Sequence, residues 1–367
     1  MDTGFSRLQS VFGLVVLAAV AGGVSAHTKH SPHIRTLLRS GHLDRLPERP
    51  FFDARSTASV LVASPATIAK NGDPVTVTWS GVTDAVSNDW VGLYLSPEDE
   101  HTSYADFVYV TSSETWSSGA GSLNFTIVNL RRPLQFRYFQ YRGSDAYNLI
   151  AVSNTFEHAN VNEPVQGHVA LTGKGDEMRV MFVTSDASAR PVVQYGLQPG
   201  VYSYEAYGSS VTYTADMMCG SPANTESAST FIDPGYTHDV LLAQLLPATK
   251  YYYRFGTHEY GFSTERYFKT APLLGNPVNR FIAYGDMGDD LPGSQGVAQR
   301  LMAEVIEVDT DFILHFGDIS YAVGRGSLWE TFCNLIDPIA SFSPYMVSIG
   351  NHEVIESFFF FSILEIA

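Results

Sequence analysis

Three polar clusters in the last quarter of the sequence contain side chains that could hold metal ions. Asp286 lies in the segment FIAYGDMGDD, Asp318 and Tyr321 lie in FILHFGDISY, and Asn351 and His352 lie in YMVSIGNHE. Together they offer two carboxylates, a phenol, an amide oxygen and an imidazole. Oxygen donors suit hard cations such as iron, manganese, zinc or magnesium, whereas soft sites use thiolates. The residue types therefore indicate a metal centre built mainly from oxygen ligands.

Each cluster follows a short run of β-branched and aromatic residues, which predicts three strands buried on both faces. Asp318 follows Asp286 by 32 residues (318 − 286), and Asn351 follows Asp318 by 33 (351 − 318). This is the length of a strand plus a crossover helix, and the intervening segments SQGVAQRLMAEVIE and SLWETFCNLIDPIASF have apolar residues at helical spacing. Right-handed crossovers would bring the three polar ends to one edge of a parallel sheet, where open α/β sheets bind ligands.

Each motif is weak by itself, since a Gly-Asp pair at a strand end is more often a turn. Three such motifs at the ends of consecutive strands are much harder to explain by chance. An aspartate at the end of the central strand, here Asp318, can bridge two cations about 3.5–4 Å apart, as in two-metal hydrolases. The spacing thus favours one dinuclear site over three unrelated turns.

The motifs GDMG, GDISY and GNHE resemble the first three metal-binding blocks of the purple acid phosphatases, a group of calcineurin-like metallophosphoesterases that GDxxY separates from most of that superfamily. The resemblance implies that Asp286 and Tyr321 bind a ferric ion, and that Asp318 bridges it to a divalent ion. It also implies that Asn351 binds the divalent zinc, manganese or iron, and that His352 contacts the substrate phosphate or the leaving group. The implied activity is hydrolysis of phosphate monoesters.

The resemblance is incomplete after Glu353. The family takes its remaining ligands from three later histidines, in a VxxH-like block and in GHxH, and the 367-residue sequence contains no GHxH. Four of the seven expected ligand positions are present, and the last residues, VIESFFFFSILEIA, do not resemble the family. We expect a C-terminally truncated chain with little or no phosphatase activity by itself.

Two other functions stay open at this point. One is a non-catalytic secreted protein that binds a partner through its β-sandwiches. The other is a different metallophosphoesterase, such as a phosphodiesterase or a nucleotide phosphatase. Tyr321 argues against the second alternative, because the violet colour of the resembled family requires a phenolate on ferric iron. The natural ester and the oligomeric state are left open.

Two all-β segments precede the metal motifs. Residues 55–158 and 160–272 contain short alternating runs separated by turn residues, such as PVTVTW and KYYYRFG, which is typical of fibronectin type III-like sandwiches. The second segment resembles the N-terminal domain of large plant-type purple acid phosphatases, and the first fits a longer subgroup with an extra sandwich. The predicted architecture is two β-sandwiches followed, over residues 278–367, by the first βαβαβ portion of an α/β metallophosphoesterase sandwich.

The N-terminus has the features of a secretory signal peptide over residues 1–26: a basic start at Arg7, an apolar run and the small-residue sequence Val24-Ser25-Ala26. The run is too short to span a bilayer comfortably, so we expect no stable membrane insertion. Residues 27–54 are predicted to be a linker or pro-segment. Asn124-Phe125-Thr126 is an N-glycosylation acceptor pattern and would suit a surface loop. A secreted glycoprotein is expected, outside the cell or in the vacuole or cell wall.

Charge and cysteine content narrow the choice of partners. The formal net charge of −16 argues against nucleic-acid binding, because that function needs basic patches. A phosphate-ester substrate is the expected partner. The only two cysteines, Cys219 and Cys333, lie in different predicted domains, so the sequence does not decide whether they form a disulfide.

Overall fold

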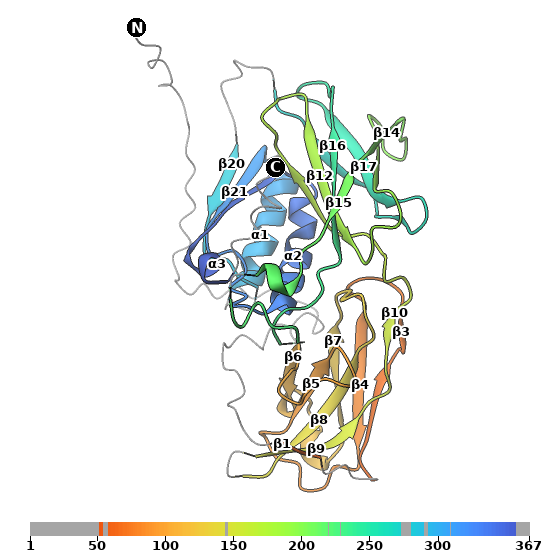
Figure 1. Ribbon diagram of the computed structural model, residues 1–367, viewed down its shortest axis with the longest axis vertical. Helices are drawn as coiled ribbons and strands as arrows, with labels where there is room; N and C mark the ends of the chain where they lie inside the picture. The colour runs from red at the N-terminus through yellow and green to blue at the C-terminus, as the bar shows by residue number, and fades with distance from the viewer. Residues whose placement is uncertain are drawn as a thin grey trace.

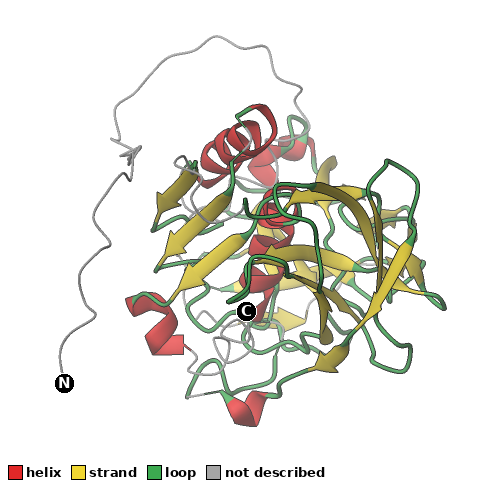
Figure 2. Cartoon of the chain, turned by 90° about the horizontal axis from the view of Figure 1, so that it is seen from above, coloured by secondary structure: helices red, strands yellow, loops and turns green. Residues whose placement is uncertain are grey.

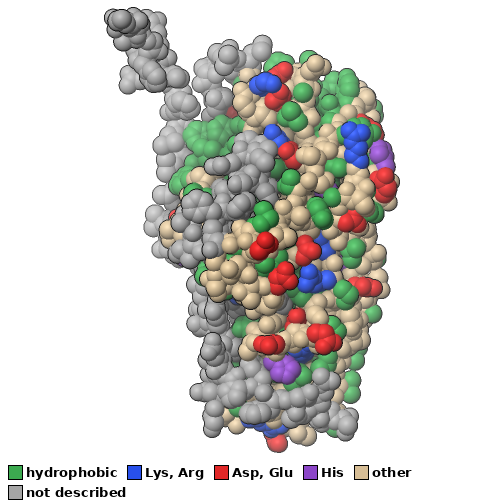
Figure 3. All heavy atoms as spheres, viewed as in Figure 1, with side chains coloured by type: hydrophobic (Ala, Val, Ile, Leu, Met, Phe, Trp, Pro, Cys, Tyr) green, Lys and Arg blue, Asp and Glu red, His purple; other side chains and the backbone are tan. Residues whose placement is uncertain are grey.

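The computed structural model describes residues 51–53, 58–143, 146–218, 220–227, 229–272, 280–289, 293–308 and 310–356. Figure 1 shows two β-sandwiches and an α/β portion that lies beside the second sandwich. On the same face, acidic side chains are spread among hydrophobic and uncharged ones (Figure 3). The predicted signal peptide, Cys219 and the final segment 357–367 lie outside the described residues. No helix in the described ranges is long and apolar enough to cross a membrane.

The first sandwich packs two sheets around its main apolar core. One sheet has the strand order β1-β9-β8-β5-β6 and the other the order β2-β4-β7, with a short β10-β3 pair beside them. The strands are β1 (Phe51–Asp53), β2 (Val60–Ser64), β3 (Thr67–Ile68), β4 (Pro74–Ser80), β5 (Trp90–Tyr94), β6 (Asp106–Tyr109), β7 (Gly121–Thr126), β8 (Gln135–Tyr141), β9 (Tyr147–Val152) and β10 (Glu157–His158). The alternation predicted for PVTVTW is present in β4, where Val75, Val77 and Trp79 enter the core.

Two expectations for this region differ from the structure. Phe51–Asp53, the end of the predicted linker, pairs in parallel with Tyr147–Leu149 of β9 and so belongs to a sheet. Asn124 lies within β7 instead of on a loop. Its side chain is nevertheless exposed, because side chains alternate along a strand and its neighbours Leu123 and Phe125 take the buried positions.

The second sandwich also consists of two sheets, with orders β11-β12-β16-β15 and β14-β13-β17-β18, and β19 pairs with β17. Its strands are β11 (Val165–Ala170), β12 (Met178–Thr184), β13 (Val192–Gly196), β14 (Tyr204–Tyr207), β15 (Ser209–Val211), β16 (Tyr236–Leu242), β17 (Lys250–Thr257), β18 (Gly261–Phe262) and β19 (Arg266–Lys269). Aromatic side chains from both sheets, among them Phe182, Phe255 and Phe268, fill the core. Burial of such rings supplies much of the stability of a sandwich.

The α/β portion contains three parallel strands in the order β20-β21-β22. The elements are β20 (Phe281–Tyr284), α1 (Ser294–Glu307), β21 (Phe312–Phe316), α2 (Gly326–Ala340), β22 (Tyr345–Ser348) and α3 (Asn351–Glu356). Leu301 of α1, Phe332 of α2 and Ile313 of β21 belong to one apolar core, so both long helices cover the same face of the sheet. The predicted βαβαβ portion is therefore confirmed.

The expectation that these strands are buried on both faces is wrong. In β21, Ile313 and His315 are fully buried, whereas Leu314 is 36% and Phe316 is 57% exposed. Because α1 and α2 both pack on the Ile313 side, the alternate side chains point to a face that no described helix covers.

The α/β portion is joined to the second sandwich through α2 and β22. In Figure 2 a helix lies between the three strands and the strands of that sandwich. The Tyr253 hydroxyl donates to Ser341 O at 2.6 Å, and a ring nitrogen of His168 lies 2.6 Å from Tyr345 O. A mostly apolar cavity of about 90 Å³ remains at this boundary, lined in part by the free thiol of Cys333.

Candidate metal centre

The ends of the parallel strands bring the predicted site residues to one edge of the sheet. Asp286 and Asp318 each lie two residues beyond a strand, and Asn351 and His352 form the start of α3. Backbone hydrogen bonds continue past the strands, since Asp286 N donates to Gly317 O at 3.2 Å and Gly317 N donates to Ser348 O at 2.9 Å. The three loops therefore leave the sheet side by side.

The Tyr321 hydroxyl joins the carboxylates of two different strand ends. It lies 2.9 Å from Asp286 Oδ1 and 3.3 Å from Asp318 Oδ2, and it donates to them. Burial, the hydrogen bond to Asp286 and the negative charge of the two carboxylates raise the pKa of the Tyr321 phenol above its ordinary value of 10.0. A bound cation would act in the opposite direction, because a positive charge favours the phenolate.

Three of the four predicted ligands have left-handed backbone conformations. The φ angles are 58° at Asp286, 49° at Asp318 and 53° at Tyr321. Residues other than glycine rarely adopt this region, and where they do the surrounding structure must enforce it, often at a functional site. The unusual backbone thus coincides with the residues singled out by chemistry.

His352 lies against the same group of oxygens. Its backbone N–H donates to Asp318 Oδ1 at 3.1 Å, and its Nε2 lies 4.0 Å from Asp318 Oδ2. The imidazole and the Tyr321 ring have centroids 4.4 Å apart. Asn351, the preceding residue, has an exposed side chain at the first position of α3. The structure therefore brings Asp286, Asp318, Tyr321 and His352 into contact and places Asn351 beside them.

Glu353, to which the sequence motifs assign no role, holds the loops at this edge together. Its carboxylate accepts hydrogen bonds from Asp318 N at 2.9 Å, Ile319 N at 2.7 Å and Gly350 N at 2.9 Å, and the residue is only 2% exposed. The bond from Gly350, three residues earlier, is half of a capping box at the start of a helix. A glutamate three residues after a glycine at a strand-to-helix turn was the available clue.

Gly350 has a steric role at the site. A Cβ at this position would lie 2.3 Å from both Asp318 N and Asp318 Oδ1, far inside the contact distance. Only glycine allows the third loop to approach the end of the central strand this closely. The glycine of the GNHE motif is therefore required by packing, because a side chain at this position would clash with Asp318.

The donor set fits a hard cation but is a partial ligand sphere. The Tyr321 phenol oxygen is already within hydrogen-bonding distance of the carboxylates of Asp286 and Asp318, and such oxygens suit iron, manganese, zinc or magnesium. Within the described ranges, no three His, Cys, Asp or Glu side chains gather as a metal-binding group. The set therefore depends on the phenol and on the exposed amide of Asn351.

Two family models match the chain. The N-terminal domain of purple acid phosphatases matches residues 164–270, and the calcineurin-like phosphoesterase model matches residues 279–366. The first covers the second sandwich, and the second contains all five predicted site residues.

Individual relatives agree with these models. Probable inactive purple acid phosphatase 9 of Arabidopsis thaliana is 32% identical over 82% of this chain and 49% of its own length. Purple acid phosphatase 21 of the same plant is 37% identical over 53% of this chain and 38% of its own length. The structure of purple acid phosphatase PPD1 from yellow lupin seeds has a TM-score of 0.71 at 28% identity, covering 81% of this chain and 58% of that one.

The chain spans about half the length of the curated relatives that match most of it. Within that span, its second sandwich and its α/β portion match the two domain models in the order found here. The chain therefore belongs to the purple acid phosphatase family.

Proposed function

We propose that this chain supplies part of a dinuclear metal centre that hydrolyses phosphate monoesters. The observation that carries the proposal is the contact of one phenol with carboxylates from two strand ends, at 2.9 and 3.3 Å. Family membership supports the substrate class, since phosphate esters are what a phosphoesterase acts on. Neither alternative, a non-catalytic sandwich protein or another metallophosphoesterase, is favoured by a specific observation.

Each residue at the edge has a separate proposed role. Asp286 and Tyr321 would hold one cation, a ferric ion, and Asn351 would hold a divalent zinc, manganese or iron. Asp318, at the end of the central strand, would contact both. A pair of such cations supplies an acidic bound water and neutralises charge on the phosphate.

His352 is the proposed catalytic side chain of the set. Its ring packs against Tyr321 and lies near Asp318. A phosphate ester bound to cations held by these two residues would therefore lie close to the imidazole. There it could donate a proton to the departing alkoxide or hydrogen-bond to the phosphate. The backbone N–H bond to Asp318 keeps the residue in place.

We propose that the 367-residue polypeptide is at most weakly active by itself. The described residues bring together two carboxylates, a phenol and an amide but no histidine ligand. We expect this partial donor set to bind divalent ions weakly, and without a bound cation two nearby carboxylates disfavour each other's charged form. Several relatives bear the name probable inactive purple acid phosphatase, which supports low turnover.

Secretion and glycosylation at Asn124 remain proposals. They are supported by the apolar N-terminal segment and by the exposure of Asn124 in β7. We propose that residues 55–158, 160–272 and 278–367 form separate domains, and that β1 (Phe51–Asp53), which pairs with β9, belongs to the first of them.

Metal binding tests the site before activity does. Isothermal titration with Mn²⁺ and absorption spectra after ferric loading would be recorded for wild type, Asp318→Asn and Tyr321→Phe. Asp318→Asn is expected to weaken Mn²⁺ binding at least tenfold, and Tyr321→Phe to abolish the phenolate-to-iron absorption. Glu307→Gln on the exposed side of α1 is the matched charge control. Binding and absorption that are identical in all four proteins would overturn the proposal.

Turnover is tested separately with a chromogenic phosphate ester in acidic buffer. The iron- and zinc-loaded chain is expected to be far slower than a full-length purple acid phosphatase. A comparable rate would contradict the proposed weak activity while leaving the metal site intact.

A further inference from the structure

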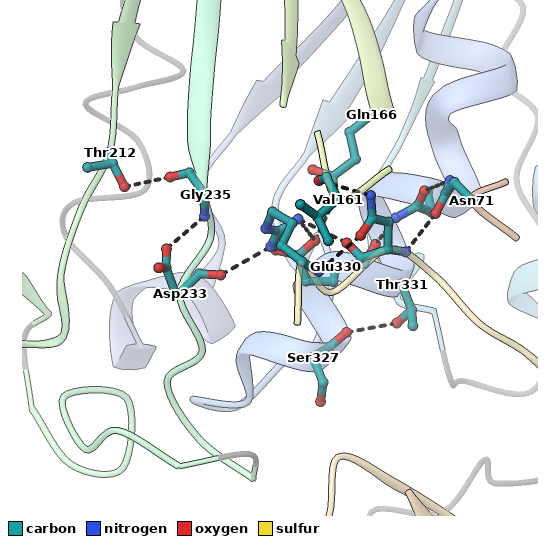
Figure 4. Close-up of polar contacts among 12 residues, drawn as sticks. Asn71, Val161, Gln166, Thr212, Asp233, Gly235, Ser327, Glu330 and Thr331 are labelled. Carbon is teal, nitrogen blue, oxygen red and sulfur yellow. Dashed lines mark hydrogen bonds and ion pairs between the residues drawn. The ribbon is translucent and has the colours of Figure 1, made fainter. Parts of the chain in front are cut away.

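The first sandwich contacts α2 through a buried ion pair. Arg131, in the loop between β7 and β8, donates to both carboxylate oxygens of Glu330 at 3.1 and 2.5 Å. Their side chains are only 4% and 8% exposed. Gln166 of the second sandwich donates to the same carboxylate at 2.7 Å, and Figure 4 shows Gln166, Glu330 and Asp233 around this contact. We call Arg131, Glu330, Gln166 and Asp233 the Arg131 junction.

The backbone around this ion pair adopts unusual conformations. Arg131 has a φ of 63°, which is unusual for a bulky residue. Its guanidinium also donates to Asn129 O and Asp233 O, both at 3.1 Å. A Cβ on Gly235 would lie 2.3 Å from Thr184 O and 2.8 Å from Arg131 Cδ, so the backbone beside the arginine leaves room only for glycine. The two sandwiches and α2 therefore meet in one tightly fitted contact.

Further contacts hold the residues just before and at the start of α2. The Arg325 side chain and the Ser327 hydroxyl donate to Ala105 O of the first sandwich at 3.2 and 3.3 Å. Gly326 N donates to Thr230 O of the second sandwich at 2.6 Å. The start of α2 is thus hydrogen-bonded to both sandwiches.

The segment that leads into α2, residues 318–326, contains two of the proposed metal ligands, Asp318 and Tyr321. Only four residues separate Tyr321 from Gly326, the first residue of α2. Between Asp318 and α2, Asp318, Tyr321 and Val323 all have φ angles near 50°, so the segment keeps its shape only if both ends are fixed. Glu353 fixes the Asp318 end, and the contacts of α2 fix the other.

We propose that the first sandwich is a positioning element of the metal centre: through the Arg131 junction and Ala105 it fixes the start of α2 and so holds Tyr321 against Asp286 and Asp318. Arg131 is then a positioning residue, not a catalytic one. The inference deepens the proposed function, on which it rests for the role of Tyr321, but the mechanical link between the sandwich and residues 318–326 exists whether or not metal binds.

The test is hydrogen exchange of the full chain, without metal, in wild type and Arg131→Met. Five backbone amides of this segment have hydrogen-bond acceptors: those of Asp318, Ile319, Ala322, Arg325 and Gly326. Exchange in peptides covering 318–326 therefore measures how firmly both ends of the segment are held. Exchange there is expected to rise at least tenfold, while peptides of β4 and β17 stay within twofold. Arg300→Met removes an ion pair on α1 in which the arginine is 69% exposed; it is the matched control and is expected to leave 318–326 unchanged.

Two further variants keep the test decisive. Arg131→Met with Glu330→Leu removes both charges, so no buried carboxylate is left unpaired; it is expected to loosen 318–326 in the same selective way. If Arg131→Met does not fold, Arg325→Met deletes a single contact to Ala105 and is expected to give a smaller, several-fold rise confined to the same peptide. Unchanged exchange in 318–326, or an equal rise in both sandwiches, would overturn the inference.

Mn²⁺ titration separates this inference from the proposed function. Wild type is expected to bind Mn²⁺ and Arg131→Met to bind it about tenfold more weakly. If wild type binds no Mn²⁺ while the exchange result holds, the proposed metal centre fails and the positioning of residues 318–326 stands. If wild type and Arg131→Met bind equally and exchange is unchanged, the positioning role fails and the metal centre stands.

Discussion

Replacing Glu353 by glutamine is expected to loosen the metal-binding edge of the sheet selectively. The substitution keeps the size of the side chain and removes its charge and one acceptor oxygen. Glu353 now accepts three backbone N–H bonds, from Asp318, Ile319 and Gly350. An amide oxygen can replace only one of the two carboxylate oxygens, so the amide nitrogen must face at least one backbone donor.

The structure sets the size of the effect. The better orientation keeps the oxygen on Asp318 N and Gly350 N, which share Oε2, and turns the NH₂ toward Ile319 N. Leaving that buried N–H unsatisfied costs about 1–3 kcal/mol, and the two remaining bonds weaken by roughly half when the acceptor loses its charge. With the lower values, about 1 kcal/mol for the unsatisfied N–H and about 1 kcal/mol for each weakened bond, the local cost is about 3 kcal/mol, or roughly a hundred-fold in the opening equilibrium.

Hydrogen exchange measures this quantity directly, because opening of a local segment sets amide exchange there. Peptides covering 317–320 and 349–351 are expected to exchange roughly a hundred-fold faster in Glu353→Gln. Glu307→Gln, an exposed position on α1, should match wild type. Global unfolding is a poorer measure, since a chain of several domains need not unfold in one step.

Protection at Asp318 and Ile319 within threefold of wild type in Glu353→Gln would refute the reasoning. It would mean that the three bonds do not hold the strand ends together. An increase of the same size in β4 of the first sandwich would also count against it, because the effect would then not be local.

Three further outcomes are expected. Gly350→Ala puts a Cβ 2.3 Å from Asp318 N and should weaken Mn²⁺ binding by titration, whereas Gly296→Ala, with open space around it in α1, should bind like wild type; equal affinities would show that the third loop can move aside. Burial lowers the pKa of His168 and His238 from 6.5 to about 4, so the unfolded chain takes up protons that the folded chain excludes, and stability should fall between about pH 6.5 and 4, by about 2 kcal/mol per histidine at about pH 5. Urea unfolding across this range should show a shallower pH slope for His238→Gln, and an unchanged slope would mean that this histidine is not the cause. Asn124 is exposed in β7, so the chain secreted from a eukaryotic host should lose mass on deglycosylation and Asn124→Gln should not; a wild-type mass unaffected by the treatment would exclude a glycan there.

Periodicity and composition were enough to predict most of the elements. The segment predicted as the first crossover helix is α1 (Ser294–Glu307), and the run predicted around PVTVTW is β4 (Pro74–Ser80). In both segments the spacing of apolar residues shows which side chains face a core, and this spacing can be read from a few neighbouring residues. The regular spacing of the three polar motifs likewise predicted a βαβαβ order, because strand and helix lengths are nearly constant.

The sequence by itself determined that oxygen donors at Asp286, Asp318 and Tyr321 follow consecutive strands of one parallel sheet. Only the tertiary structure decided what holds them in place: the buried carboxylate of Glu353 across two strand ends, and the pair of Arg131 with Glu330, which are 199 residues apart in the chain. It also decided that one face of β21 is exposed. These features depend on contacts between segments that are far apart in the sequence, and local sequence patterns do not specify such contacts. The strands can be found one by one, but the contacts that shape the site exist only between them.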